Sequence, residues 1–347
     1  MAATMKDIAN RTGLGLATIS KYLNGGNVRE KNRIAIEAAI RELDFTVNEV
    51  ARGLKTRHTR TIGIVIPELS NVFITSVISA MEDILRQRGY GVLVCDSRTD
   101  PVLEQQAVQF LLNKRVDGIV VMPVSGDGAS ILPAIQMEIP VVLIDRLVEA
   151  LDGQVDSVSV DNFRASYDSI DYLIQQGHQR IGIIAGPKGI YTSRQRLAGY
   201  RAAMERHHLP VSESMIHFSD YTLQGGYHAA EEFLACAPEA TALFVTNYEM
   251  TLGTMLLFNE MGIKIPDQVS VIGFDNLELA RIVNPKLTIV EQPIRELGIR
   301  TAEILLERFA KPEEAEKRSK VVLSTSLQLG NSVKKIVSSN GDRGKEI

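Results

Sequence analysis

Short apolar runs of strand length alternate with helix-length amphipathic stretches over most of the chain, from Thr61 onward. Alternation of this kind is typical of parallel sheets that are covered by helices on both faces. The pattern therefore predicts a doubly wound α/β body. The expected strands lie at residues 62–66, 91–95, 118–122, 141–144, 181–185, 243–246 and 269–273.

One stretch of this pattern occurs twice. Residues 61–64 (TIGI) are echoed 119 residues later by residues 180–183 (RIGI), and a turn and a helical stretch follow each copy. The echo indicates two similar α/β subdomains. Because ligands of such sheets bind beyond the carboxyl ends of the strands, we expect a ligand site in the cleft between the subdomains.

The first 45 residues follow a different, helical pattern. Thr4 and Asp7 have the spacing of a capping box, and Gly13 ends the helix that they begin. A second helix is expected over residues 16–24 and a third over residues 29–43. Two short helices joined by a glycine turn place the second helix in the major groove of DNA.

The second of these helices has an apolar face and an open face. Ile19 and Leu23 share the apolar face, so that other side chains remain free to reach base edges. These side chains are Leu16, Ala17, Thr18 and Lys21.

Residues 48–55 resemble a short helix that Asn48 would cap, and basic residues follow it. Two interpretations remain open here. The segment is a flexible linker, or it is a hinge that folds on DNA and wedges Leu54 into the minor groove.

Charge and composition agree with a division into two parts. Residues 1–60 hold eleven Lys and Arg against six Asp and Glu, a balance of +5, while the remainder has a balance of −9. A basic head on an acidic body suits a DNA-reading module attached to a sensor. The length of 347 residues suits two or three domains.

Nothing in the sequence indicates a membrane span, a secretory signal or a bound metal. No run of about 18 apolar residues occurs, and the N-terminus has no apolar core of a signal peptide. Cys95 and Cys236 stand far apart without clustered histidines, so we expect two free thiols. We therefore expect a cytoplasmic protein that has no cofactor and no metal.

Acids, amides and arginines gather just after the predicted strands, with an aromatic residue among them. Each could instead cap a helix or form a surface ion pair, but together they suit a polyhydroxylated ligand. Carboxylates accept from its hydroxyls, and arginine or amide groups donate to them. The residues are Phe73, Asp145, Arg146, Arg194, Arg196, Asn247, Asp275 and Asn276.

Eight segments in order resemble the LacI/GalR family of bacterial transcriptional regulators, over about residues 4–330. They are residues 5–9 (MKDIA), 17–20 (ATIS), 48–54 (NEVARGL), 115–119 (RVDGI), 177–181 (GHQRI), 196–200 (RLAGY), 272–276 (IGFDN) and 287–293 (LTIVEQP).

The resemblance implies a lambda-repressor-like helix-turn-helix headpiece and a periplasmic-binding-protein-like core of two doubly wound subdomains. The headpiece would span residues 1–47 and the hinge helix with its linker residues 48–60. The core would span residues 61–330. Its N-subdomain would take about residues 61–160 and 289–323, and its C-subdomain about residues 161–288 and 324–330. Residues 331–347 have no periodicity, and we expect them to be a disordered tail.

The resemblance also implies a homodimer on a pseudo-palindromic operator, with a small effector between the subdomains. The implied DNA-binding residues are Thr4, Lys6, Leu16, Ala17, Thr18, Ser20, Lys21, Asn24, Asn48, Ala51, Leu54 and Lys55. The implied effector-binding residues are Phe73, Asp145, Arg146, Arg196, Tyr221, Asn247, Tyr248, Asp275 and Gln292.

The chain departs from the family pattern at four positions. Gly15 stands where Ser or Thr commonly caps the recognition helix, and Lys21 replaces the usual Arg. Tyr248 stands where Asp usually follows Asn247. Ile190 lies where purine-sensing members carry an arginine, which argues against a purine effector.

The leading hypothesis is an effector-controlled repressor of a carbohydrate-utilisation operon. A second hypothesis keeps the regulator but makes a sugar phosphate or a partner protein the signal, because Arg146, Lys188 and Arg194 lie near the cleft. A solute-binding protein would lack the first sixty residues. An enzyme is disfavoured, since the nucleotide, hydrolase and metalloprotease motifs are absent.

Overall fold

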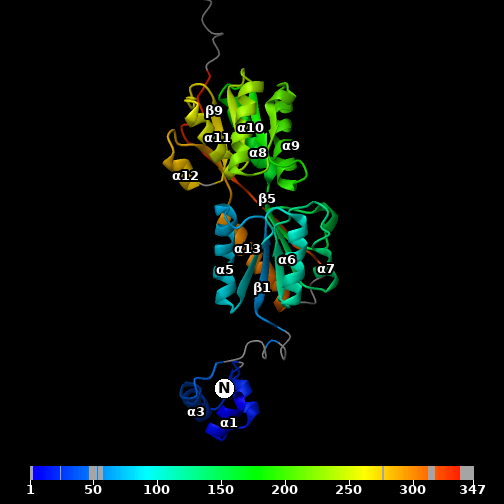
Figure 1. The fold of residues 1–347 in the computed structure, drawn as a ribbon, viewed down its shortest axis with the longest axis vertical. Coiled ribbons are helices and arrows are strands. Elements are labelled where there is room, and N and C mark those ends of the chain that lie inside the picture. The colour runs from blue at the N-terminus through cyan, green and yellow to red at the C-terminus, as the bar shows by residue number, and fades with distance from the viewer. Residues whose placement is uncertain are drawn as a thin grey trace, which may run out of the picture. The chain divides into compact units, whose positions relative to one another are not determined.

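The computed structural model describes residues 3–23, 25–46, 53, 58–275, 277–311 and 317–336. The chain forms two compact units, Met1–Arg60 and Thr61–Ile347 (Figure 1). Among the described residues, no helix is both long and apolar enough to cross a membrane.

The first unit contains three helices, α1 (Met5–Thr12), α2 (Leu16–Leu23) and α3 (Glu30–Glu42). Thr4 and Asp7 form the predicted capping box at the start of α1, and Gly13 ends α1 in the left-handed conformation, with φ of 67°. The helices surround a small core that includes Ile19, which was predicted on the apolar face of the second helix. Its fully buried members are Ile8, Ile19, Ile36 and Ala39.

The second unit begins with a parallel six-stranded sheet in the order β11-β5-β4-β3-β1-β2. Helices cover both of its faces, and a buried cluster lies under each set of helices. The strands are β1 (Thr61–Ile66), β2 (Gly91–Asp96), β3 (Gly118–Val121), β4 (Val141–Ile144), β5 (Asp156–Val160) and β11 (Lys320–Leu323). The helices are α5 (Val72–Gln87), α6 (Pro101–Asn113), α7 (Leu132–Gln136) and α13 (Ile294–Ala310), with a 3-10 turn η1 (Glu149–Leu151).

A second six-stranded sheet follows in the order β12-β10-β9-β8-β6-β7, and only β12 runs antiparallel to its neighbour. Helices again flank it, with α8 beside α9 and α10 beside α11 (Figure 1). Its strands are β6 (Ile181–Ala185), β7 (Ile216–Phe218), β8 (Ala242–Val245), β9 (Ser270–Phe274), β10 (Thr288–Glu291) and β12 (Ser326–Gln328). Its helices are α8 (Asn162–Gln175), α9 (Tyr191–Arg206), α10 (Leu223–Cys236), α11 (Tyr248–Glu260) and α12 (Leu277–Ile282), with a 3-10 turn η2 (Glu213–Met215).

The two sheets have equivalent strand orders, so that β1 corresponds to β6 and β4 to β9. The repeated sequence segments lie on β1 and β6, the two corresponding strands. The predicted doubly wound pair of subdomains is therefore present. All seven predicted apolar runs form strands, while β5, β7, β10, β11 and β12 were not predicted.

The chain crosses between the subdomains three times, after Val160, after Glu291 and after Leu323. The predicted position of the second crossing, at about residues 288 and 289, lies three residues before the observed crossing. It falls inside β10, which pairs in parallel with β9 from Thr288 onward and so belongs wholly to the second sheet.

The prediction of a disordered tail from residue 331 is wrong for residues 331–336. Ser332 is fully buried, its hydroxyl donates to the Val271 carbonyl at 2.6 Å, and it accepts from the Thr288 amide at 2.8 Å. The Ile336 amide donates to the carbonyl of Gln176 at 2.7 Å. These residues are held by backbone and hydroxyl hydrogen bonds, which leave no hydrophobic periodicity to detect. Residues 337–347 lie outside the described residues.

We predict that Ser332→Ala lowers the free energy of unfolding by about 1–3 kcal/mol, because it leaves a buried amide and a buried carbonyl without their partner. Chemical denaturation of the variant measures this loss. Ser324→Ala, which removes an exposed hydroxyl, is the control and should change stability little. Equal stability of both variants and the wild type would contradict the role of Ser332.

Candidate functional site

A hollow of about 410 Å³ lies between the two subdomains of the second unit, and we call it the central cleft. Its lining comes from segments that follow the carboxyl ends of strands in both sheets, where parallel sheets bind ligands. All nine residues predicted to bind an effector line it: Phe73, Asp145, Arg146, Arg196, Tyr221, Asn247, Tyr248, Asp275 and Gln292. Four lining residues were not predicted: Asn71, Ile74, Met122 and Thr192.

Asp145 and Asp275 occupy equivalent positions in the two subdomains, directly after β4 and β9. Both have a left-handed backbone, with φ of 63° and 62°, a conformation that Asp tolerates better than most side chains. The backbone amide of each donates to a carbonyl of the neighbouring strand: Asp145 to Val158 at 2.9 Å, and Asp275 to Val290 at 2.8 Å. The two buried carboxylates therefore enter the central cleft from opposite subdomains.

Arg196, on α9, is 4% exposed and is fixed in the wall of the cleft. Its Nε donates to Asn162 Oδ1 at 2.8 Å, and its Nη1 donates to the carbonyl of Thr246 at 2.5 Å. The guanidinium carbon lies 3.7 Å from the centre of the Phe274 ring, a cation–π contact. Arg196 is thereby held in one orientation beside the two carboxylates.

Burial raises the pKa of both aspartates, that of Asp275 to about 7. The positive charge of Arg196 opposes this rise at each of them, and the charge of Asp145 adds to it at Asp275. Gln292 holds Asp275 in place, because its Nε2 donates to both carboxylate oxygens, at 2.8 and 3.0 Å. The central cleft therefore contains a positioned carboxyl group that changes its charge near neutral pH.

Tyr221 and Arg146 meet across the cleft, one from each subdomain. The Arg146 guanidinium carbon lies 5.5 Å from the Tyr221 ring centre, and its Nη1 donates to the Pro123 carbonyl at 3.3 Å. The Tyr221 and Thr192 hydroxyls are 3.0 Å apart. The ring lies against Gly186, where any Cβ would stand 2.1 Å from Tyr221 Cζ. This packing fixes the ring plane on which Arg146 stacks.

Three buried polar atoms of the cleft have no hydrogen-bond partner among the described residues. They are Asp145 Oδ1, Arg146 Nε and Gln292 Oε1. Buried polar groups are normally hydrogen-bonded, so these atoms mark where a ligand could bind. Gln292 Oε1 requires a donor, Arg146 Nε requires an acceptor, and Asp145 Oδ1 accepts when it is ionised.

Lys188 and Arg194, which the sequence offered as further contacts for a sugar phosphate, lie outside the lining of the central cleft. Arg194 forms an ion pair with Glu149 at 2.8 Å, and the Lys188 ammonium lies 4.5 Å from the Phe218 ring centre. Of the three cations, only Arg146 reaches the cleft.

In the first unit, the exposed side of α2 carries predicted DNA-binding residues. Leu16 is 45% exposed, and Ala17 and Lys21 are also exposed. Thr18 and Ser20 are half-buried. Lys6 is exposed, while Thr4 caps α1. The predicted DNA contacts Asn24, Asn48, Ala51, Leu54 and Lys55 lie outside the described residues, and so does most of the predicted hinge helix.

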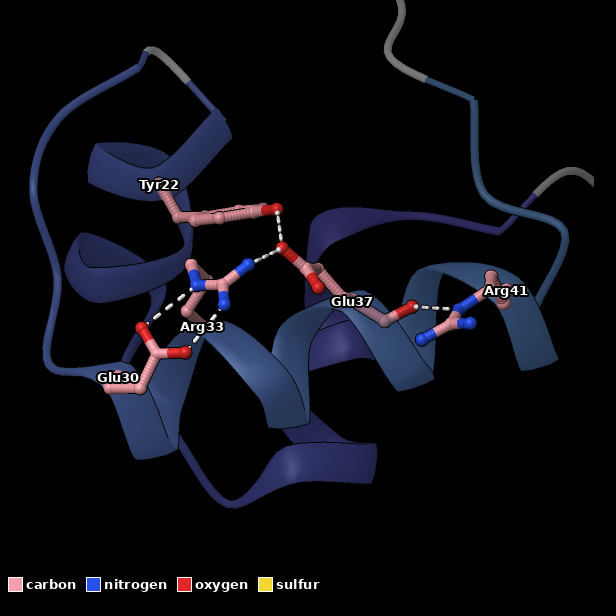
Figure 2. Close-up of polar contacts among 5 residues, drawn as sticks. All are labelled: Tyr22, Glu30, Arg33, Glu37 and Arg41. Atoms are coloured by element: carbon pink, nitrogen blue, oxygen red, sulfur yellow. Dashed lines mark hydrogen bonds and ion pairs between the residues drawn. The ribbon is translucent and has the colours of Figure 1, made fainter.

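A polar network connects α2 to α3 (Figure 2). The Tyr22 hydroxyl donates to Glu37 at 2.9 Å, and Arg33 bonds both Glu37 and Glu30. The bond to Glu37 raises the pKa of the Tyr22 phenol. Sequence reasoning missed Tyr22, because an aromatic residue beside an apolar stripe is indistinguishable from a core residue. The network fixes how α2 sits on α3.

Glycines bound α2 at both ends. Gly15 precedes the helix and contributes only its carbonyl, which accepts from the Thr18 amide at 2.9 Å. At the other end, the Gly25 amide donates to Tyr22 and the Gly26 amide to Lys21, the pattern of a Schellman motif. Gly25 has φ of 75°, as this motif requires.

Two family models match the chain. "Periplasmic binding proteins and sugar binding domain of LacI family" matches residues 59–329, and "Bacterial regulatory proteins, lacI family" matches residues 4–48. The HTH-type transcriptional repressor PurR of Klebsiella pneumoniae (strain 342) is 34% identical over 315 residues, which cover 90% of this chain and 92% of that protein.

Solved structures of similar regulators match the chain over nearly its whole length. The Lac repressor dimer bound to operator and the anti-inducer ONPF is 25% identical, with a TM-score of 0.85, and the match covers 96% of this chain and all of that one. A complex of the transcriptional regulator CelR with cellobiose is 27% identical, with a TM-score of 0.74, and the match covers 95% of this chain and 99% of that one.

We predict that Asp275→Asn changes the pH dependence of stability. Burial raises the pKa of Asp275 to about 7, whereas the pKa of an aspartate in an unfolded chain is about 4. Between these values the folded state keeps a proton that the unfolded chain has released, so the contribution of Asp275 to stability is lost as pH rises. The melting temperature of Asp275→Asn, relative to the wild type, should therefore increase as pH rises through this window.

Asp267→Asn, which changes an exposed carboxylate, is the control and should follow the wild type at every pH. If the melting temperature of Asp275→Asn ran parallel to that of the wild type from about pH 4 to pH 7.5, Asp275 would titrate as an ordinary aspartate.

Proposed function

The chain belongs to the LacI family of bacterial regulatory proteins, and we propose that it represses transcription as a homodimer under the control of a small neutral sugar. It is a DNA-binding transcriptional regulator with a helix-turn-helix unit and a periplasmic-binding-protein-like core. The observation that carries the effector assignment is the set of unpartnered polar atoms beside Arg196 in the central cleft.

A polyhydroxylated ligand satisfies these atoms in the simplest way. Its hydroxyls donate to Gln292 Oε1 and Asp145 Oδ1, and a hydroxyl or ring oxygen accepts from Arg146 Nε. Phe73 and Tyr248 supply ring surface for the faces of a sugar. The cellobiose complex of a related regulator supports this assignment.

A neutral sugar fits better than a sugar phosphate. Phosphate oxygens of a dianion only accept hydrogen bonds, so a phosphate would leave the acceptors Gln292 Oε1 and Asp145 Oδ1 without a donor. Arg194 and Lys188 contact other groups, which leaves Arg146 and Arg196 as the cations that line the cleft. We assign Asp145 and Asp275 to binding and not to catalysis, because Gln292 holds the Asp275 carboxyl in place and Asp145 Oδ1 is left without a partner, as expected of acceptors for ligand hydroxyls.

The proposed dimer face lies at the edge of the first sheet. β2 is the last strand of that sheet, and its Leu93 and Val94 are 36% and 38% exposed. Phe110 and Val102 of the adjacent α6 are also exposed. Proteins rarely leave an apolar edge strand open to solvent, so a second copy of this chain is the proposed cover. The operator-bound dimer of the similar Lac repressor supports a dimeric state.

The proposed mechanism is linkage between the cleft and DNA. A sugar that favours one closure angle of the subdomains changes how the dimer presents its two helix-turn-helix units. Such coupling typically amounts to about 1–3 kcal/mol. We place this activity in the cytoplasm, where operator DNA is available.

We predict that a thermal-shift screen finds a neutral sugar as ligand. The probes are pentoses, hexoses, disaccharides and their phosphates, with D-ribose and cellobiose among them. A ligand of the folded state raises the melting temperature in a concentration-dependent way. Arg196→Met should abolish that rise, while Arg180→Met, at an exposed arginine of the same subdomain, should retain it. Binding of phosphates alone, or an unchanged rise in Arg196→Met, would contradict the proposal.

We predict that Lys21→Ala weakens binding to an operator, selected from a random DNA pool, more than binding to unrelated DNA. A base contact is worth about 1–3 kcal/mol of discrimination, whereas a phosphate contact affects all sequences alike. Fluorescence anisotropy with both DNAs measures the two affinities. Lys31→Ala, at an exposed lysine of α3 that is not among the predicted base contacts, is the control and should leave the ratio of the two affinities unchanged. A uniform loss for Lys21→Ala would make Lys21 a phosphate contact.

A further inference from the structure

Asn162 sits at the first of the three crossings between the subdomains. The crossing follows the end of β5 at Val160, and Asn162 is the first residue of α8. Its side chain is 2% exposed. A buried amide is costly unless both of its ends are bonded, and here both are.

The orientation of the Asn162 amide is fixed by its two partners. Its Nδ2 donates to the Val160 carbonyl at 3.2 Å, and its Oδ1 accepts from Arg196 Nε at 2.8 Å. A carbonyl can only accept and an arginine can only donate, so that the opposite orientation would break both bonds. Asn162 therefore connects the backbone of the crossing to the guanidinium that lines the central cleft.

The hydrogen bond from Arg196 Nε to Asn162 restricts how the Arg196 guanidinium can rotate. Its other anchors, the Thr246 carbonyl and the Phe274 ring, follow or end strands of the second sheet. The guanidinium is planar, so that a bond at Nε and a bond at Nη1 together set the direction of the remaining N–H groups. If the Nε bond were absent, the group could turn about its bond to Thr246 while staying against the ring.

The second crossing carries a similar device. Gln292 directly follows β10 and donates to both carboxylate oxygens of Asp275. Two crossings thus each carry an amide that holds a charged group of the cleft, Arg196 at one and Asp275 at the other. A neutral amide suits this place because it bonds either charge without adding one.

We propose that Asn162 is a positioning residue of the effector site, which sets the fork of Arg196 and makes it follow the conformation of the crossing. A hinge rotation that shifts the Val160 carbonyl, the partner of Asn162 Nδ2 at the end of β5, shifts the acceptor of Arg196 Nε with it. The affinity of Arg196 for a ligand hydroxyl consequently depends on the closure angle. This proposal rests on the assignment of the central cleft as the effector site.

The first test needs no ligand. The Nε–H resonance of Arg196, assigned by its disappearance in Arg196→Lys, should shift and exchange faster with water in Asn162→Ala. It should stay protected in Asn162→Asp, which keeps an acceptor for Nε. Ser169→Ala is the matched control, because it removes a buried side-chain hydrogen bond on the same helix that involves only Ala165. An Arg196 Nε–H resonance that is unchanged in Asn162→Ala would overturn the proposal.

The second test uses the sugar with the largest thermal shift among the pentoses, hexoses, disaccharides and phosphates screened. Calorimetry should show that Asn162→Ala binds it about tenfold more weakly, while Ser169→Ala binds it normally. In an Arg196→Lys background, which has no Nε–H fork, the further change Asn162→Ala should have no additional effect. If the Asn162→Ala variant does not fold, Asn162→Ser replaces it in the same binding measurement.

The outcomes separate this proposal from the proposed function. If Arg196→Met abolishes binding while Asn162→Ala leaves it intact, the cleft is the effector site and the role of Asn162 is wrong. If Arg196→Met binds normally, the assignment of the cleft itself fails. If no sugar of the screen binds, the sugar assignment fails and the Nε–H resonance alone decides the role of Asn162.

Discussion

A guanidinium fixed inside the protein, that of Arg196, is the constraint on which the central cleft depends. Taking such a charge out of water is expensive, and it is tolerated only where hydrogen bonds and opposite charges surround it. Here the Thr246 carbonyl, the Asn162 amide and the Phe274 ring hold the group, and the buried carboxylates of Asp145 and Asp275 lie within its field. The elements that supply these groups include two strands of the second sheet, the first crossing and the end of β4. Disturbing any of them alters the charge balance of the cleft.

Much of the fold could be predicted because strands buried on both faces are strongly apolar and read clearly in the sequence. The strands that escaped prediction are short or carry polar residues, as in Asp156–Val160, where acid and serine residues alternate with valine. Their place in the sheets comes from pairing with neighbours, which the local pattern does not contain. The same reason explains the misplaced crossing near β10 and the hidden order of residues 331–336, where hydroxyl and backbone bonds hold the chain.

Some residues of the candidate site could likewise be predicted from the sequence, and others could not. Charged residues after strands were identifiable, because Asp and Arg are costly to bury and stand out beside apolar runs. Asn71 and Asn162 were not, since an amide near a helix start usually signals only a cap; Asn71 does accept from the Ile74 amide as a cap should. Their second role, at the cleft, depends on which elements meet there. The left-handed backbone of Asp145 and Asp275 likewise follows from sheet geometry and carries no local sequence signal.

The central claim is that occupancy of the cleft and affinity for DNA are coupled through the subdomain hinge. The direct measurement is the dissociation constant of the full chain for its selected operator, with and without a saturating concentration of the bound sugar. Coupling of the two sites should change this dissociation constant by about 5–150-fold, and linkage requires that the operator change the affinity for the sugar by the same factor. Equal operator affinity in both conditions, with the sugar shown to be bound, would contradict it.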